Sequence, residues 1–312
     1  MVGQLELSLR RFLVCAGLGC GLGLTLHAGQ VEARRLTDKA APAAQKLSLR
    51  STAAIIQDQE TGEILFAKNV SAIAPIASIT KLMTAMVVLD ADPDLSEVIA
   101  ISVEDIDLLR GTRSRLQPGA ALTRDELLRL ALMASENRAA SALGRSFPGG
   151  IAAFTAAMNH KAQMLGMNDS RFGDATGLSS ANVSSAEDLA KLVRAAHRYP
   201  LISRYTTLSN FEVYVGGRPL VFRNTNRLVV GGSWEIGLSK TGFTNDAGRC
   251  LVLQARLAER QVIIILLDSW GKLSRIGDAV RIRKWLEASA RSQAGAAQKA
   301  AQKVRVIAGP PA

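Results

Sequence analysis

The chain has 312 residues, 48% hydrophobic and 21% charged, which is enough for a substantial core and excludes a wholly disordered or collagen-like chain. Aromatic residues make up only 4%, fewer than a stacking platform for single-stranded nucleic acid requires. The net charge of +11 lies mainly at the ends, because residues 1–28, 29–50 and 288–312 carry +1, +3 and +4 and leave +3 for residues 51–287. This distribution argues against a basic nucleic-acid-binding globule.

Residues 1–28 are predicted to be an export signal. Arg10 and Arg11 precede an apolar run, Phe12–Leu26, and small residues follow it. The run is about fifteen residues long, shorter than the ~20 residues of a transmembrane helix, and contains four glycines. We therefore expect export, cleavage near residues 28–33 and no stable membrane anchor afterwards. The alternative is an uncleaved N-terminal anchor.

Cysteine and histidine usage argues against a disulfide or a metal site in the mature chain. Two of the three cysteines lie in the predicted signal, which leaves Cys250 alone beside an apolar run, where a buried small hydrophobic residue is expected. His160 and His197 are the only histidines after the signal, and neither has a partner at ligand spacing. We expect no zinc site and no cofactor.

The order of predicted elements indicates the fold. Residues 29–50 are predicted to be a linker, residues 51–287 one domain, and residues 288–312 a basic low-complexity tail that is disordered or partly helical. The domain's predicted elements are a hairpin of Ala53–Asp58 and Glu63–Lys68, helices at Ile79–Leu89, at Arg124–Ala134 behind the capping box Thr123–Glu126 and after a second box at Ser184–Glu187, strands near 234–241, 250–257 and 261–268, and a helix at Leu273–Leu286. This order predicts an α+β fold, in which both ends of the domain complete one antiparallel sheet around a helical insert.

The first chemically informative pair is Ser78 and Lys81, at the start of the first predicted helix. Residues three apart lie on one helix face, so the lysine is beside the serine. A lysine in an apolar setting has a lowered pKa and can accept the serine proton. Taken alone the pattern is common, and it recurs at Ser269 and Lys272, where Gly271 predicts a turn instead.

Two further motifs follow along the chain. Ser135 and Asn137 come directly after a predicted amphipathic helix, where a loop should begin. The triplet Lys240-Thr241-Gly242 occurs once, at the end of a strand on which Trp234, Ile236, Leu238 and Lys240 alternate. Burying the charge of a lysine at the end of an apolar strand face costs free energy unless the lysine is paired or has a function. Gly242 allows close backbone approach to a ligand.

Together the three motifs resemble those of the penicillin-binding proteins and serine β-lactamases. Over roughly residues 50–287 the chain is similar to the low-molecular-mass D-Ala-D-Ala peptidases, whose fold is a five-stranded antiparallel sheet flanked by helices plus an all-helical subdomain. The stretches that look closest to the murein DD-endopeptidase subgroup (penicillin-binding protein seven/eight) are Ile76–Ala85, Leu132–Ala140, Phe222–Asn226 and Lys240–Asn245.

The resemblance implies a periplasmic serine peptidase that hydrolyses peptidoglycan stem-peptide cross-links and is inhibited by β-lactams. It implies acylation of Ser78, proton removal by Lys81, and proton relay to the leaving amine by Ser135. The substrate-binding residues that it implies are Asn137 on the substrate amide, Lys240 and Thr241 on the anionic end, and Gly242 with Phe243, whose N–H group would form the oxyanion hole with that of Ser78.

Three alternatives remain open. About 46 residues lie between Lys240 and the tail, which disfavours the carboxypeptidases that have a C-terminal β-domain but does not exclude carboxypeptidase activity. A β-lactamase of the commonest class would need a glutamate between the second and third motifs for fast deacylation, and Met167–Val183 has none. A wall-binding protein without catalysis would not need all of these polar residues.

Overall fold

The computed structural model describes residues 47–308, with side chains to residue 299. The predicted signal, its cleavage site and residues 29–46 of the predicted linker lie outside the described residues. Within the described part, no helix is both long and apolar enough to cross a membrane. The elements are β1 (Ser51–Asp58), β2 (Ile64–Lys68), β3 (Ala74–Pro75), η1 (Ala77–Ile79), α1 (Thr80–Asp90), β4 (Val98–Ala100), η2 (Val103–Asp105), β5 (Ala121–Thr123), α2 (Arg124–Met133), α3 (Asn137–Arg145), α4 (Gly150–Met164), β6 (Val183–Ser184), α5 (Ala186–Ala196), α6 (Pro200–Thr206), β7 (Asn210–Val215), β8 (Arg218–Arg223), α7 (Arg227–Val230), β9 (Glu235–Thr244), β10 (Gly248–Leu257), β11 (Arg260–Ser269) and α8 (Ser274–Ala308).

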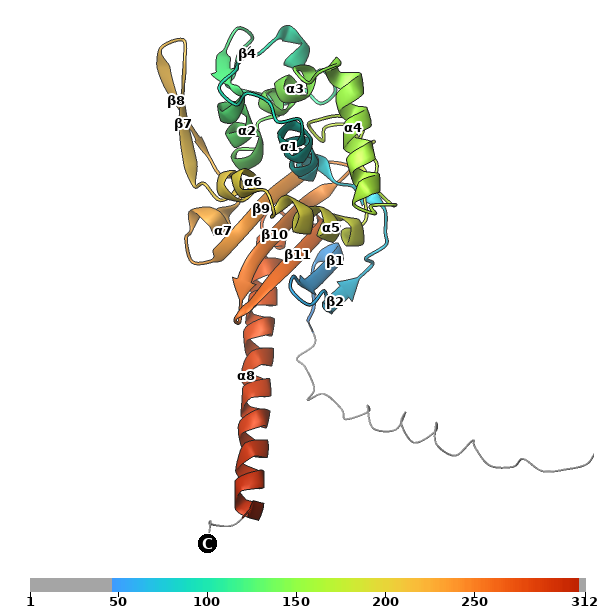
Figure 1. Ribbon diagram of the computed structural model, residues 1–312, viewed down its shortest axis with the longest axis vertical. Helices are drawn as coiled ribbons and strands as arrows, with labels where there is room; N and C mark the ends of the chain where they lie inside the picture. The colour runs from blue at the N-terminus through green and yellow to red at the C-terminus, as the bar shows by residue number, and fades with distance from the viewer. Residues whose placement is uncertain (1–46, 309–312) are drawn as a thin grey trace, which may run out of the picture. The chain divides into compact units, whose positions relative to one another are not determined.

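One five-stranded sheet forms the centre of the domain, in the order β2-β1-β11-β10-β9 (Figure 1). All four neighbouring pairs are antiparallel, and β1 pairs with β11, so the first and last strands of the domain lie side by side. Helices make up most of the regular structure between β2 and β9. The α+β fold predicted from the order of elements is therefore confirmed.

The central strands are buried on both faces because their apolar residues alternate between two hydrophobic clusters. On β11, Ile263, Ile265 and Leu267 face the cluster that includes α1 to α6. The intervening residues, Val262, Ile264 and Leu266, face the second cluster, which includes α8. The continuous apolar run of β11 predicts this two-sided burial, and the structure confirms it.

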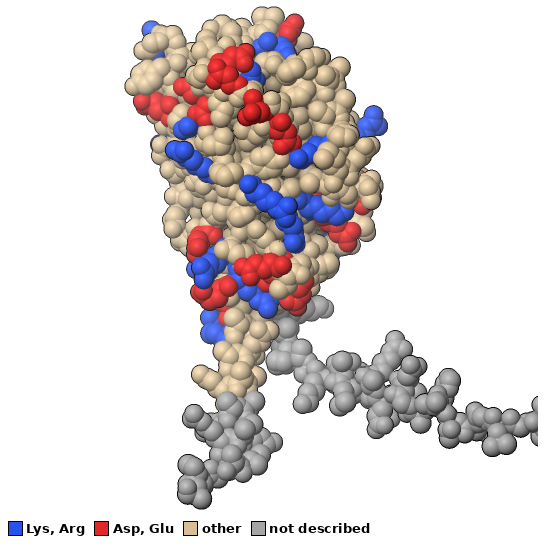
Figure 2. All heavy atoms as spheres, in the orientation of Figure 1, with Lys and Arg blue, Asp and Glu red and all other residues tan. Residues whose placement is uncertain are grey.

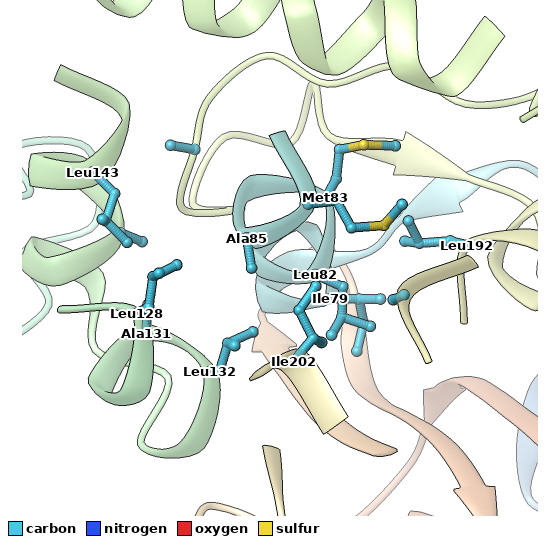
Figure 3. Close-up of a cluster of buried hydrophobic side chains, with 14 of the residues drawn as sticks. Ile79, Leu82, Met83, Ala85, Leu128, Ala131, Leu132, Leu143, Leu192 and Ile202 are labelled. Atoms are coloured by element: carbon cyan, nitrogen blue, oxygen red, sulfur yellow. The ribbon is translucent and has the colours of Figure 1, made fainter. Parts of the chain in front are cut away.

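Helix α1 lies at the centre of the larger cluster. It is apolar all round, and its residues from Thr80 to Val88 are buried. Figure 3 shows Leu82 and Met83 of this helix among side chains from α2, α3, α5 and α6. The polar side chains of Thr80, Lys81 and Thr84 are therefore removed from water, whereas Asp90, the last residue of α1, is exposed.

Both ends of the domain differ from the sequence prediction. Leu49, inside the predicted linker, is buried against the α8 cluster. Helix α8 does not end at Leu286 but continues to Ala308, through most of the predicted tail. Its inner turns bury Ala279, Ile282 and Leu286, whereas residues 291–294 and 296–299 are exposed. A run rich in Ala, Gln and Lys has high helix propensity, which explains the extension.

Two local predictions were also inaccurate. The N-cap of α5 is Ser185, whose side chain accepts a hydrogen bond from Asp188 N, rather than Ser184. The hairpin β7–β8 was not predicted.

On the face drawn in Figure 2, acidic and basic side chains are interspersed, as expected for a domain with a small net charge of its own.

Candidate active site

The first two predicted site residues lie at the junction of η1 and α1. Ser78 is in the 3₁₀ turn η1 rather than at the N-cap of an α-helix, and Lys81 is one turn further on in α1. The distance between Lys81 Nζ and Ser78 Oγ is 2.9 Å. Ser78 is half-buried, whereas Lys81 is completely buried. The pair is thus in direct contact, with the serine open toward solvent and the lysine enclosed.

Lys81 Nζ has two further neighbours. They are Asn137 Oδ1 at 2.8 Å and the carbonyl oxygen of Thr176 at 2.6 Å. Burial lowers the pKa of Lys81 to about 8, although the charges of Asp174 and Glu136 oppose this shift. Lys81 can therefore lose its proton near neutral pH.

Ser135 lies in the short break between α2 and α3, and Asn137 is the first residue of α3. Ser135 has a φ of 58°, in the left-handed region that is strained for a residue with a side chain. Glu136 then caps α3 by accepting a hydrogen bond from Ala139 N at 2.8 Å. This geometry directs Ser135 toward β9, where Lys240 Nζ lies 2.8 Å from Ser135 Oγ.

Lys240 is the second buried lysine of the site. Burial, together with the positive charges of Lys81 and Arg275, holds the pKa of Lys240 well below its ordinary range. Two sets of contacts therefore bring the three motifs together: Lys81 contacts Ser78 and Asn137, and Lys240 contacts Ser135.

The predicted alternation along β9 is only partly right. Leu238 and Lys240 face the helical cluster, but Trp234 and Ile236 pack against the α8 cluster. The pairing of β9 with β10 shifts by one residue at Gly237, which inverts the faces before it. A Cβ atom on Gly237 would lie 2.1 Å from Gln254 Oε1, so a larger residue at this bulge would require the Gln254 side chain to move.

The backbone at Gly242 approaches the Ile76–Ser78 segment closely. A Cβ atom at this position would lie 2.8 Å from the carbonyl oxygen of Ile76 and 3.3 Å from Ser78 N. Arg275 Nη1 donates to the carbonyl oxygen of Gly242 at 2.7 Å and fixes the strand end from the other side. The next residue, Phe243, is exposed, with the Arg249 guanidinium over its ring.

Thr241 and Asn137 are each fixed by a residue that the sequence analysis did not identify. Thr241 Oγ1 lies 2.6 Å from Thr225 Oγ1, in the stretch that resembles the endopeptidase subgroup. Asn137 Nδ2 donates to Thr112 Oγ1 at 3.0 Å. A threonine in a loop carries no distinctive pattern, so no sequence signal could have found Thr112.

The loop that provides the Thr176 carbonyl is organised by Asp174. One carboxylate oxygen accepts from the N–H groups of Thr176 and Gly177, and the other accepts from Ser179 N and Asn182 Nδ2. Burial alone would raise the pKa of Asp174, but these hydrogen bonds and that of the Thr176 hydroxyl lower it. Asp174 is therefore committed to holding the loop.

The second Ser-x-x-Lys sequence is a turn, as predicted. Ser269 ends β11, with Ser269 Oγ 2.5 Å from Ser51 Oγ, and Lys272 is exposed in the following turn. Cys250 is buried in the helical cluster, also as predicted.

Comparison with known proteins gives a consistent result. A family model described as D-alanyl-D-alanine carboxypeptidase, peptidase S11, matches residues 39–270. The D-alanyl-D-alanine endopeptidase of Pseudomonas aeruginosa is 46% identical over 254 residues, covering 81% of this chain and 82% of its own. That of Escherichia coli is 43% identical over 251 residues, covering 80% and 81%. The crystal structure of the Streptomyces K15 DD-transpeptidase matches with a TM-score of 0.73 at 25% identity and covers 78% of this chain and 99% of that one. The chain therefore belongs to the D-alanyl-D-alanine carboxypeptidase family, peptidase S11, and is a serine D-Ala-D-Ala peptidase.

Proposed function

We propose that the protein is an exported serine DD-endopeptidase, which hydrolyses the D-Ala–diamino acid cross-links of peptidoglycan through an acyl-enzyme on Ser78. The observation that carries the chemistry is the contact of 2.9 Å between Ser78 Oγ and the buried Nζ of Lys81. The choice of endopeptidase is supported by the two relatives with that name, which align with about four-fifths of the chain.

The surroundings of Lys81 suit a neutral amine that acts as a base. A neutral lysine has two N–H groups and one lone pair. Asn137 Oδ1 and the Thr176 carbonyl accept the two N–H groups, which leaves the lone pair for the Ser78 hydroxyl. Lys81 then takes the hydroxyl proton while Ser78 Oγ attacks the carbonyl carbon of the D-Ala residue.

The oxyanion that forms would be stabilised by the N–H groups of Ser78 and Phe243. The close contact of Gly242 with the Ile76–Ser78 segment supports this assignment, since it brings the two backbones together. Ser135 then passes a proton to the leaving amine as its C–N bond breaks, assisted by Lys240 at 2.8 Å. Water then attacks the ester carbonyl as the leaving amine would in the reverse reaction, giving up a proton to the same groups, and the ester bond breaks to release Ser78.

Substrate binding is assigned to the same strand. Lys240 and Thr241 would hold the anionic end of the substrate, and Asn137 would orient its amide while it keeps contact with Lys81. β-Lactam antibiotics would acylate Ser78 by the same reaction. We place the enzyme in the periplasm after removal of the predicted signal.

Carboxypeptidase activity is the alternative, because both reactions pass through the same acyl-enzyme. A β-lactamase is disfavoured by the state of Asp174, the nearest equivalent of a deacylating carboxylate in Met167–Val183, since both of its oxygens bind the loop. A wall-binding protein without catalysis would not need two buried lysines beside two serines, and burying lysines costs free energy.

The deciding experiment is chromatography of muropeptides from purified sacculi digested by the protein. Release of monomers from cross-linked dimers is expected, and the Ser78→Ala variant serves as the inactive control. Loss of terminal D-Ala from pentapeptides with the dimers left intact would contradict the endopeptidase proposal and leave carboxypeptidase activity.

A further inference from the structure

A pocket of about 450 Å³ opens beside the catalytic groups. Three segments line it: Arg113–Arg115 from the loop before β5, Ala134–Asn137 from the break before α3 and the first residue of α3, and Phe222–Arg223 at the end of β8. Ser135 and Asn137 thus belong both to the catalytic site and to this pocket. Its volume is within the range of about 300–1,000 Å³ that holds drug-sized ligands.

The lining of the pocket is positively charged. It contains three arginines, Arg113, Arg115 and Arg223, and one acid, Glu136. Glu136 is buried and committed to capping α3, where it accepts from Ala139 N. None of the three arginines forms an ion pair with any side chain that the structure describes. The pocket is therefore suited to an anionic ligand.

Arg115 has an additional role in shaping the pocket. Its guanidinium lies 4.0 Å from the centre of the Phe222 ring, and Nη2 donates to the carbonyl oxygen of Val221 at 2.9 Å. These contacts join the loop before β5 to the β7–β8 hairpin. Arg113 and Arg223, both exposed, have no such structural commitment and remain available to a ligand.

We infer that this pocket binds carboxylates of the leaving strand, and that Arg113 and Arg223 determine specificity for cross-linked substrates. The inference rests on the proposed function, in which Ser135 protonates the leaving amine. Because Ser135 lines the pocket, we place the atoms attached to that amine in it. In a carboxypeptidase reaction these atoms are a single D-Ala, whereas in cleavage of a cross-link they are a whole stem peptide with several carboxylates. Guanidinium groups recognise carboxylates well, so the arginines favour the larger, anionic leaving group.

The test uses the purified protein and the variants Arg113→Gln, Arg223→Gln and their combination. The matched control is Arg218→Gln, which removes an exposed arginine at the other end of β8. Three rates are measured: cleavage of a purified dimeric muropeptide, release of D-Ala from a monomeric pentapeptide, and acylation by a fluorescent penicillin. Each single variant should lower kcat/KM on the dimer about five- to tenfold, mainly through KM. D-Ala release, acylation and the control should stay within about twofold of the unmodified protein. The normal acylation also shows that the variants are folded.

The salt dependence provides a second measurement. Added salt screens exposed charge pairs, so it should slow dimer cleavage by the unmodified protein more than by the double variant. Equal loss of dimer cleavage and D-Ala release in the arginine variants would overturn the inference, as would dimer cleavage at the unmodified rate. If the unmodified protein releases D-Ala but leaves dimers intact, the proposed endopeptidase function itself fails.

Discussion

The pH dependence of acylation should follow the titration of Lys81. With a pKa of about 8, this lysine is neutral in about one molecule in ten at pH 7, whereas at the ordinary value of 10.5 it would be neutral in about one in three thousand. Only the neutral form can accept the Ser78 proton, so acylation must slow as the pH falls. Between pH 8 and pH 6 the neutral fraction drops from about one half to about one hundredth, which predicts a decrease of about fiftyfold.

The variant Glu136→Gln tests the cause of this pKa. The charge of Glu136 raises the pKa of Lys81, so its removal should lower that pKa and move the pH profile toward acid. Glutamine keeps an acceptor for Ala139 N, which preserves the cap of α3. The assay is the second-order rate constant of acylation by a fluorescent penicillin, measured by stopped flow from pH 5.5 to 9.5. Lys81→Arg should not be acylated, because a guanidinium does not lose its proton below a pH of about 12.

The reasoning would be refuted by an acylation rate that is constant across this pH range, or by an active Lys81→Arg variant. A profile of Glu136→Gln that moves toward alkaline pH would contradict the electrostatic part alone. Circular dichroism of each variant checks that the fold is retained.

Three further predictions concern the acylated state and β9. Ser78→Ala should abolish penicillin labelling while the free energy of unfolding, measured in urea, changes by less than about 1 kcal/mol. A penicillin adduct mapped to Ser135 would show that Ser78 is not the acylated residue. The penicillin adduct should persist in intact-mass measurements, because Asp174 is bound by the loop and cannot activate a deacylating water, and turnover within seconds would favour a β-lactamase. Gly242→Ala should destabilise the protein by about 1–3 kcal/mol and slow acylation, since the new Cβ would lie 2.8 Å from the Ile76 carbonyl oxygen. Unchanged stability and acylation would show that the Ile76 backbone can move away from the new Cβ without cost.

Much of the fold followed from the sequence because its periodicity is strong. The continuous apolar run of β11 requires a strand buried on both faces, and Thr123 with Glu126 forms a capping box that starts α2 at the predicted residue. The inversion of faces at Gly237 could not be predicted, because the bulge depends on how β9 pairs with β10. The alternation of apolar residues within one strand carries no information about that pairing. The full extension of α8 beyond Leu286 could not be predicted either, because its residues form no buried apolar stripe that would indicate a helix.

For the site, the sequence by itself determined the three motifs and their order, since each is a short pattern of chemically distinctive residues. Only the tertiary structure decided how they meet: Lys240 lies 2.8 Å from Ser135, although 105 residues separate them in the chain. It also decided the pKa of Lys81, because burial by surrounding helices is not a property of any local pattern. The Thr176 carbonyl and the arginines beside Ser135 were invisible for the same reason, since a backbone oxygen or an exposed arginine acquires a role only from what folding places next to it.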